Sequence, residues 1–298
     1  MMPGLGETAA FLTAISWTIT ALSFQLAGQK VGSLSVNLIR IIIAFFLLTL
    51  FNLFYRGLLL PTDASASAWL WLSLSGFIGF FLGDLFLFQA YATIGARLTT
   101  LIMAAVPPLA ALLDWFFLGE TLEPKSMIGM SITILGIAMV VFKPDRKNKS
   151  MQLTLSFSGL FLAFGGALGQ AGGLFLSKLG VQNYDPTAAT QIRIIAAIPC
   201  FLFLVTVLRA WPRIFSALHN KWAMGQMTVG AISGPFIGVS LALLAIKHTR
   251  LGIATTIMAL VPVFIILPSA IFLKEKITLR EVFGSIVAVI GIWVLCLW

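Results

Sequence analysis

Charged residues are scarce in this chain, and their scarcity excludes an ordinary soluble domain. Only 10% of the 298 residues are charged, with ten Asp and Glu and nineteen Lys and Arg, while 59% are hydrophobic. A soluble domain is about 45–50% apolar and needs a polar shell. Because the mean hydropathy of this chain is +1.03, it has too few polar groups for such a shell. A lipid bilayer must cover most of its surface.

Common catalytic and binding motifs are also missing. The sequence has two His and two Cys, and it contains no GxxxxGK[ST], HExxH, CxxC or GxSxG motif. The net charge of +9 comes from single cations spread through short connections, which does not favour nucleic-acid binding. We therefore predict no enzyme, no cofactor and no metal site, with a small solute and the bilayer as partners. A membrane enzyme or a channel without a recognisable motif is the alternative.

Long apolar runs predict ten transmembrane helices. A helix rises 1.5 Å per residue, so about 20 apolar residues cross the hydrocarbon core. A transmembrane β-barrel is excluded because the runs lack alternation of period two. The predicted spans are Thr8 to Ala27, Leu34 to Phe54, Trp69 to Tyr91, Leu98 to Leu118, Ser126 to Phe142, Leu153 to Leu176, Thr187 to Leu208, Ala223 to Ile246, Gly252 to Leu273 and Glu281 to Trp298.

The second half of the chain repeats the first. A shift of 155 positions superposes residues 100–107 on 255–262 and residues 117–120 on 272–275. Arg40-Ile-Ile and Arg193-Ile-Ile match at a slightly different shift, as a loop insertion or deletion requires. Each half therefore has five spans. Because five is odd, the halves must enter the membrane from opposite sides, an arrangement typical of secondary transporters. We expect repeats at 1–142 and 153–298, joined by a basic linker loop at 143–152.

Several motifs resemble one family. They are Ile15-Ser-Trp-Thr18, Arg40, Gly83-Asp-Leu-Phe, and a string that runs from Pro107 through Phe117-Leu-Gly-Glu120 and Gly129 and recurs from Pro262 through Phe272-Leu-Lys-Glu275 and Gly284. Together they resemble the EamA family of the drug/metabolite transporter superfamily across the whole chain. The resemblance implies an all-α fold of ten helices around a central cavity. It also implies a lining mainly from spans one, three, four, six, eight and nine, and no ATP-binding domain.

Polar and polarizable residues inside the spans are candidates for the cavity wall. Neutral amides should face inward, because lipid exposure of a polar group is unfavourable. Aromatic rings and Met sulfur would form a wall suited to amino acids, nucleobases or lipophilic amines. On this basis we predict a metabolite transporter, with export as the favoured direction. The candidate residues are Trp17, Gln25, Asp84, Phe88, Gln89, Met103, Gln170 and Met258.

Four ionisable residues lie inside predicted spans, where a charge costs about 3 kcal/mol or more and normally has a partner or water. Arg40 and Asp84 lie at similar depths from one membrane face, and Arg193 and Asp114 lie near the other. We therefore predict the ion pairs Arg40–Asp84 and Arg193–Asp114. These pairs fix helix register or take part in transport. Asp84 lacks an acidic counterpart in the second half, so a proton or a cationic group could bind there.

Prolines inside the spans predict kinks, because each removes a backbone hydrogen bond. Pro107, Pro235 and Pro262 are the candidate hinges for alternating access; the alternative is that the kinks only shape the cavity.

The loop charges are unequal between the two faces. Twelve Lys and Arg lie on the loops after the odd-numbered spans and five on the other side. The positive-inside rule then places the first face in the cytoplasm and both termini outside. The family resemblance implies the reverse. We expect a multi-pass protein of the inner (plasma) membrane.

Overall fold

The computed structural model describes residues 4–119, 124–145, 150–153, 156–182, 184–249, 254, 257–274 and 277–297, and most of these are helical. The elements, in chain order, are α1 (Leu5–Val31), α2 (Ser33–Arg56), α3 (Ala66–Ser75), the π-helix η1 (Gly76–Gly83), α4 (Asp84–Ile94), α5 (Ala96–Met103), α6 (Val106–Leu118), α7 (Pro124–Val141), β1 (Phe142–Asp145), β2 (Ser150–Leu153), α8 (Phe157–Val181), α9 (Pro186–Val207), α10 (Trp211–His219), α11 (Lys221–Ala231), the π-helix η2 (Ile232–Gly238), α12 (Val239–His248), α14 (Val261–Phe264), α15 (Ile266–Phe272) and α16 (Leu279–Leu297).

Local sequence signals set the helix ends. The side chain of Ser65 accepts a hydrogen bond from the amide of Ala68 at the start of α3, and Asp185 accepts from Thr187 and Ala188 at the start of α9. These caps satisfy amide groups that the first helical turn leaves without partners. Gly57 ends α2 with a φ of 73°, a conformation that glycine adopts without strain.

Eight helical stretches in the described residues are long and apolar enough to cross a membrane. They correspond to the first eight predicted spans. The ninth predicted span is broken, because α14 and α15 are short and residues 259–260 form a turn before them. The tenth corresponds to α16. The all-α prediction is therefore correct, although the structure does not establish a count of ten membrane crossings.

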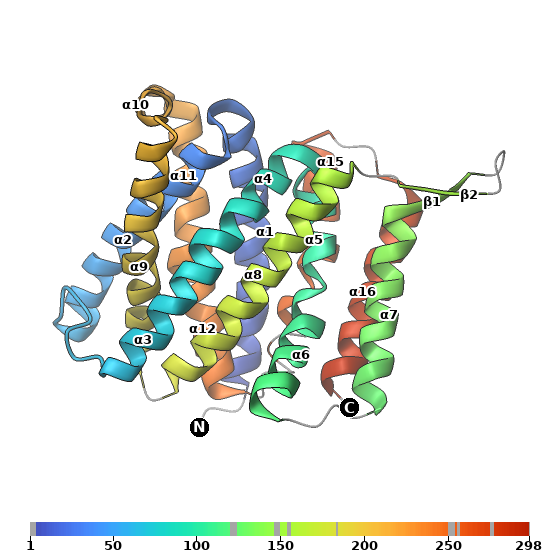
Figure 1. Cartoon of the computed structure of the whole chain (residues 1–298), viewed down its shortest axis with the longest axis horizontal. Helices are drawn as coiled ribbons and strands as arrows, with labels where there is room; N and C mark the ends of the chain where they lie inside the picture. The colour runs from blue at the N-terminus through green and yellow to red at the C-terminus, as the bar shows by residue number, and fades with distance from the viewer. Residues whose placement is uncertain are drawn as a thin grey trace.

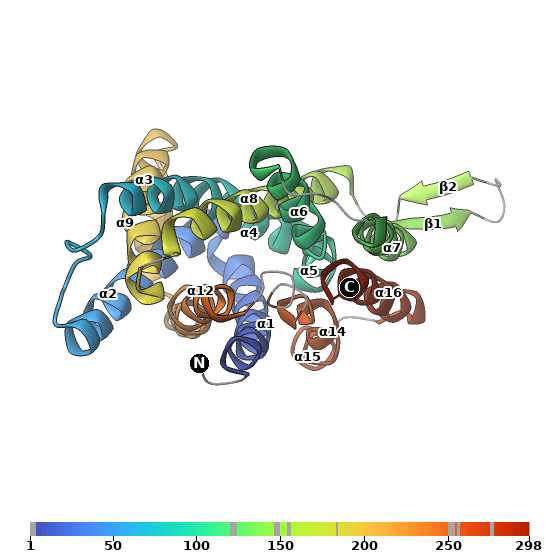
Figure 2. The same ribbon diagram turned by 90° about the horizontal axis from the view of Figure 1, so that it is seen from below.

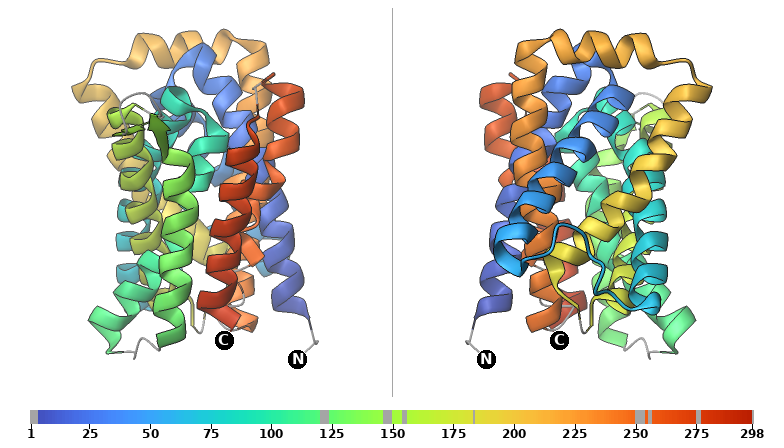
Figure 3. Two further views of the ribbon diagram at one scale, coloured as in Figure 1. Left: turned by 90° about the vertical axis from the view of Figure 1, so that its right-hand side faces the viewer. Right: turned by 90° about the vertical axis from the view of Figure 1, so that its left-hand side faces the viewer.

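Two connections differ from the prediction. The segment from Trp211, predicted as a loop, forms the amphipathic helix α10, which runs across one end of the bundle (Figure 3). The basic linker contains an antiparallel hairpin in which β1 pairs with β2, and the hairpin projects from the bundle beyond α7 (Figure 1). Both termini lie at the opposite end (Figure 1).

The two halves interleave rather than forming separate domains. Helix α8 packs along α3, η1 and α4, while α1 packs along α11, η2 and α12. Helices α7 and α16 form a closely packed pair at one side of the bundle (Figure 2). Elements of both halves therefore surround the centre of the molecule.

The residues that face outward suit a bilayer. Large apolar side chains are exposed on the bundle surface; examples are Phe54 (81%), Phe116 (73%) and Phe203 (71%). Small residues instead fill many helix contacts. A Cβ added at Gly169 would lie 2.3 Å from the Cα of Gly83. Such backbone contacts are typical of helix packing in membranes, where apolar side chains gain little by leaving the lipid.

Candidate functional site

A cavity of about 180 Å³ lies at the centre of the bundle. Its wall comes from both halves and is mostly apolar. Six of the eight residues predicted for it contribute, namely Trp17, Asp84, Phe88, Met103, Gln170 and Met258. An apolar cavity of roughly 150 Å³ holds one benzene molecule. The space therefore fits a solute about the size of one ring with a small substituent.

Equivalent positions of the two repeats line the cavity together. Residues separated by 155 positions occur as pairs in its wall, namely Phe80 with Pro235, Asp84 with Val239, Phe88 with Leu243, Met103 with Met258, and Pro107 with Pro262. Arg40 and Arg193, related by 153 positions, also line it. The site lies where the two halves meet.

Arg40 and Asp84 form a buried ion pair through Nη2 and Oδ2, as their depths in the sequence predict. Their side chains are only 4% and 5% exposed. The other carboxylate oxygen, Oδ1, accepts a hydrogen bond of 2.7 Å from Nε2 of Gln170. The Arg40 guanidinium carbon lies 4.5 Å from the centroid of the Phe88 ring. Both oxygens of Asp84 are therefore engaged by helices α2 and α8.

The predicted pair between Arg193 and Asp114 is absent from the described contacts, so this prediction is wrong. Asp114 on α6 faces α8 and accepts a hydrogen bond of 3.1 Å from Nζ of Lys178. Arg193 on α9 instead points to η1, where its guanidinium carbon lies 4.3 Å from the centroid of the Phe80 ring. Similar depth in the membrane does not fix the direction in which a side chain points around its helix.

Glycines in η1 make room for Arg193. A Cβ at Gly76 would lie 2.2 Å from the carbonyl oxygen of Arg193, and one at Gly79 would lie 3.1 Å from its Nη2. Any larger residue at Gly76 would push α9 away from η1. The absence of two side chains therefore lets the guanidinium approach the cavity.

Gln25 and Gln89 do not line the cavity, contrary to the prediction. Gln25 is buried near the end of α1, where its Oε1 accepts a hydrogen bond from the amide of Ala96. Gln89 is exposed, and its Oε1 accepts one of 2.5 Å from Ser33. Successive residues of a helix point about 100° apart, so Phe88 turns inward and Gln89 outward. Each of the two amides forms a hydrogen bond to a neighbouring helix.

Some wall residues were not predicted, in particular Phe80, Tyr91 and Thr100. Phe80 precedes Asp84 by four residues and therefore lies on the same face of the span. That spacing could have identified it from the sequence. Tyr91 and Thr100 carry no comparable signal, because aromatic and hydroxyl groups are common on helices that only pack.

The three candidate hinge prolines all line the cavity at irregular backbone. Pro107 is in the first turn of α6, just after the break at residues 104–105, and Pro262 is in the first turn of α14. Pro235 is inside η2, which occupies the place of η1 in the other repeat. Short π-helical segments are frequent at functional sites, and broken helices form the binding sites of many transporters.

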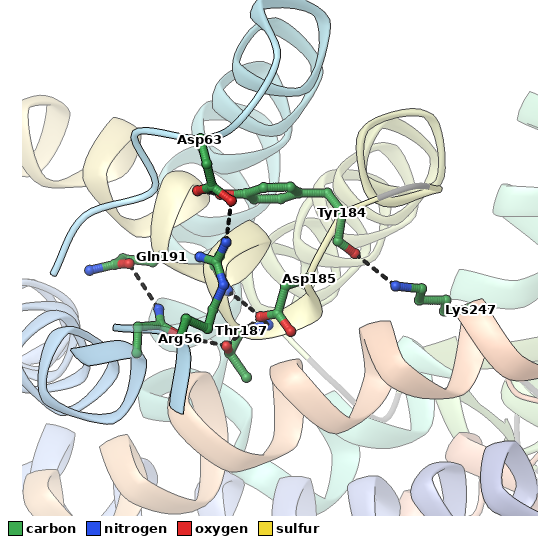
Figure 4. Close-up of polar contacts among 9 residues, drawn as sticks. Arg56, Asp63, Tyr184, Asp185, Thr187, Gln191 and Lys247 are labelled. Atoms are coloured by element: carbon green, nitrogen blue, oxygen red, sulfur yellow. Dashed lines mark hydrogen bonds and ion pairs between the residues drawn. The ribbon is translucent and has the colours of Figure 1, made fainter. Parts of the chain in front are cut away.

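A second polar cluster joins the halves at the end of the bundle that holds the termini (Figure 4). Asp63 receives a hydrogen bond of 2.9 Å from Tyr184 and pairs with Arg56. The backbone oxygen of Tyr184 accepts one of 3.1 Å from Lys247. Burial and the bond to Asp63 raise the pKa of Tyr184 to about 12. Although burial alone would raise the pKa of Asp63, Tyr184 and Arg56 lower it below its usual value. Asp63 therefore stays ionised at neutral pH, while Tyr184 keeps its proton and can donate to it.

Metal-ligand groupings are not found in the part of the chain that the structure describes, where no three His, Cys, Asp or Glu side chains gather in a way that could hold an ion.

Comparisons with known proteins support the family resemblance and the fold. A family model described as the EamA-like transporter family matches residues 4–142 and 157–297. An uncharacterized transporter from Archaeoglobus fulgidus is 30% identical over 118 residues, which are 40% of this chain and 40% of that protein. A crystal structure of another protein matches 98% of this chain and 96% of its own, with a TM-score of 0.66 and 17% identity. At that identity the likeness concerns the fold alone.

Proposed function

Because this chain belongs to the EamA-like transporter family and is a multi-pass membrane protein, we propose that it is a secondary transporter of a small organic solute in the inner (plasma) membrane. The solute would bind in the central cavity and reach either side by alternating access. The observation that carries this proposal is the wall built from equivalent residues of two repeats. Secondary transporters hold their substrate at such a repeat interface.

The backbone of the cavity wall suits a site that changes shape. Pro107, Pro235 and Pro262 stand where regular α-helical hydrogen bonding is interrupted. A segment with fewer such bonds bends at lower free energy than a regular helix. At each of these three prolines, the part of the span before the proline would tilt separately from the part after it.

Polar contacts between the halves occur at both ends of the bundle. At the end that holds the termini, Asp63 of the first half binds Tyr184 of the second. At the hairpin end, Arg97 of the first half pairs with Glu281 of the second. In alternating access one set would open while the other stays closed. The Asp63 side chain is 43% exposed, and contacts of such exposed groups are weak enough to break and reform; the Arg97–Glu281 pair is more buried, with side chains 9% and 17% exposed.

Filling the cavity should stop transport. In Ala259→Phe a ring takes up much of the 180 Å³ beside Met258, whereas Ala92→Phe adds the same ring at an exposed position of α4. Both variants and the native protein would be reconstituted into proteoliposomes without nucleotide. Exchange of radiolabelled solutes down their gradients would then be measured.

We expect the native protein and Ala92→Phe to exchange the solute and Ala259→Phe to lose most of the flux. Equal flux through both variants would place the transport path outside the cavity. A requirement for ATP on either side would contradict secondary transport.

A further inference from the structure

Arg193 is a cation of the cavity wall that forms no direct ion pair within the described residues, although Asp84, which is already paired with Arg40, is near enough to attract it. It is 4% exposed, and no described carboxylate lies within salt-bridge distance of it. Its Nε has no hydrogen-bond partner among the described residues, as is also true of the Nε of Arg40; what sets Arg193 apart is the lack of a carboxylate bonded to its guanidinium. The Phe80 ring, 4.3 Å from the guanidinium carbon, gives partial stabilisation. A buried charge is normally bonded to an ion partner, so Arg193 has room for a carboxylate of its own.

The other repeat shows what is missing. Arg40, the counterpart of Arg193, pairs with Asp84, and the counterpart of Asp84 in the second half is Val239. Val239 also lines the cavity. The first half therefore has an arginine and its carboxylate, while the second half has the arginine alone.

We propose that the carboxylate of the transported solute binds Arg193 and takes the place that Asp84 occupies beside Arg40. This inference rests on the proposed function, since it names the chemical class of the solute. A planar guanidinium donates two parallel hydrogen bonds to a carboxylate, so the match is one of shape as well as charge.

The charges of the wall fit one carboxylate better than a cation. Arg40 and Asp84 neutralise each other, and Gln170 occupies the second oxygen of Asp84. The net charge of the lining is then that of Arg193. A singly charged anion balances it, whereas a lipophilic amine would be repelled and would find no vacant carboxylate.

The rest of the wall specifies an apolar body for the acid. Trp17, Phe24, Phe88, Met103 and Met258 surround the space. The volume of about 180 Å³ is enough for one ring or a short branched chain. The solute is therefore a small monocarboxylic acid with an apolar side group.

The first test needs no ligand. Val239→Asp places a carboxylate at the position equivalent to Asp84, and Val239→Asn is the neutral control of the same size. The melting temperature of the purified full-length protein in detergent would be measured for both. If Arg193 can pair with a carboxylate at this position, the Asp variant should melt at least about 2 °C above the Asn variant.

Adding Arg193→Gln to each variant should remove that difference, because the gain comes from the pair. An Asp variant that melts at or below the Asn variant would overturn the proposal. So would a gain that survives Arg193→Gln.

The second test compares small molecules that have a similar apolar group and differ in their polar group. Benzoate, benzamide and benzylamine form one set, and butyrate, butyramide and butylamine another. We expect an acid, but neither its amide nor its amine, to raise the melting temperature of the native protein. The effect should vanish in Val239→Asp, whose own carboxylate competes.

A shift with the amides or amines equal to that with the acids would overturn the inference, as would no shift with either acid. These measurements concern binding alone. Acids that bind but are never exchanged in proteoliposomes would contradict the proposed transport function and leave the role of Arg193 intact.

Discussion

The Asp84 carboxylate is held at both oxygens, and this limits the roles it can take. Arg40 binds Oδ2 and Gln170 binds Oδ1. Arg40 is also held by Asn37, whose Oδ1 lies 3.2 Å from Nη2. A group fixed on three helices is well placed to set their register. To bind a proton or a cationic solute, as the sequence suggests, it would have to release one of these partners.

We predict that Asp84→Asn is much less stable than the native protein. The change leaves Arg40 buried without a counter-charge, and the loss of one member of a buried pair costs roughly 3–5 kcal/mol. Asp84→Asn combined with Arg40→Gln should regain most of the stability, because Arg40 is then no longer a buried charge that has lost its direct partner. Thermal unfolding in detergent would measure both.

Uptake by the double variant separates the two roles of Asp84. If the pair only fixes register, the double variant transports the solute, since Arg193 is unchanged. A double variant that is stable and cannot transport would assign Asp84 to the binding of a proton or a cationic group.

For single residues, the sequence predicted an ion pair correctly where the depth of the two residues in the membrane determined the partner. It failed where the partner depended on the direction in which the side chain points around its helix. Depth alone brought Arg40 and Asp84 together. The same reasoning joined Arg193 to Asp114, which pairs with Lys178 across a different helix contact. The close approach of α9 to η1 requires glycine at Gly76 and little bulk at Gly79, whose contacts with Arg193 join residues more than a hundred positions apart along the chain.

At the scale of the elements, the contact between α8 and η1 sets the geometry of the site. Backbone touches backbone there, since a Cβ at Gly169 would lie 2.3 Å from Gly83 and one at Gly173 would lie 2.8 Å from Gly79. Gln170 follows Gly169 and reaches Asp84 from this contact. The spacing of the two elements therefore decides whether the Gln170 amide can reach the carboxylate.

We predict that Gly169→Ala lowers the melting temperature well below that of Gly172→Ala. The two glycines lie on the same helix, and alanine has the higher helix propensity at both positions. At Gly172, however, the added Cβ meets only Cγ2 of Ile78 at 3.1 Å, a side-chain atom that can move. At Gly169 it meets the backbone of η1, so the helices must separate.

Thermal unfolding of the two purified variants checks this, with the native protein beside them. Equal melting temperatures would mean that α8 and η1 can separate at little cost, and that the glycines do not fix the site.

Most elements could be predicted from the sequence, because uninterrupted apolar runs identify membrane helices directly. The interruptions could not. The ninth span was predicted as one helix, although a turn at residues 259–260 interrupts it before the apolar stretch Val261–Phe272. Helix α10 was predicted as a loop because its Pro and polar residues resemble a connection; its buried Ile214 and Ala217 show why it folds onto the end of the bundle.

At the scale of the whole molecule, the internal repeat carried the most information. It predicted two similar halves, and the family match over residues 4–142 and 157–297 confirms the resemblance to the EamA family. It also indicated that the halves meet at a shared site. The repeat could not reveal how far the halves interleave, since the packing of α8 on η1 depends on glycine contacts between them rather than within either.

The loop charges predict how the two ends are placed relative to the membrane. Both termini lie at one end of the bundle, and the hairpin lies at the other (Figure 1). The hairpin end includes most of the loop cations. Because cationic loops are retained in the cytoplasm, we predict that Ser150 on β2 faces the cytoplasm. The loop at Thr62 should face outward.

Cysteine labelling in intact cells would decide the orientation. Ser150→Cys and Thr62→Cys would be made in a chain whose Cys200 and Cys296 are replaced by Ser. An impermeant maleimide should label the Thr62 variant in intact cells and the Ser150 variant only after the cells are opened. The opposite pattern would place both termini inside, as the family resemblance implies, and would show that the excess of loop cations does not set the topology of this chain.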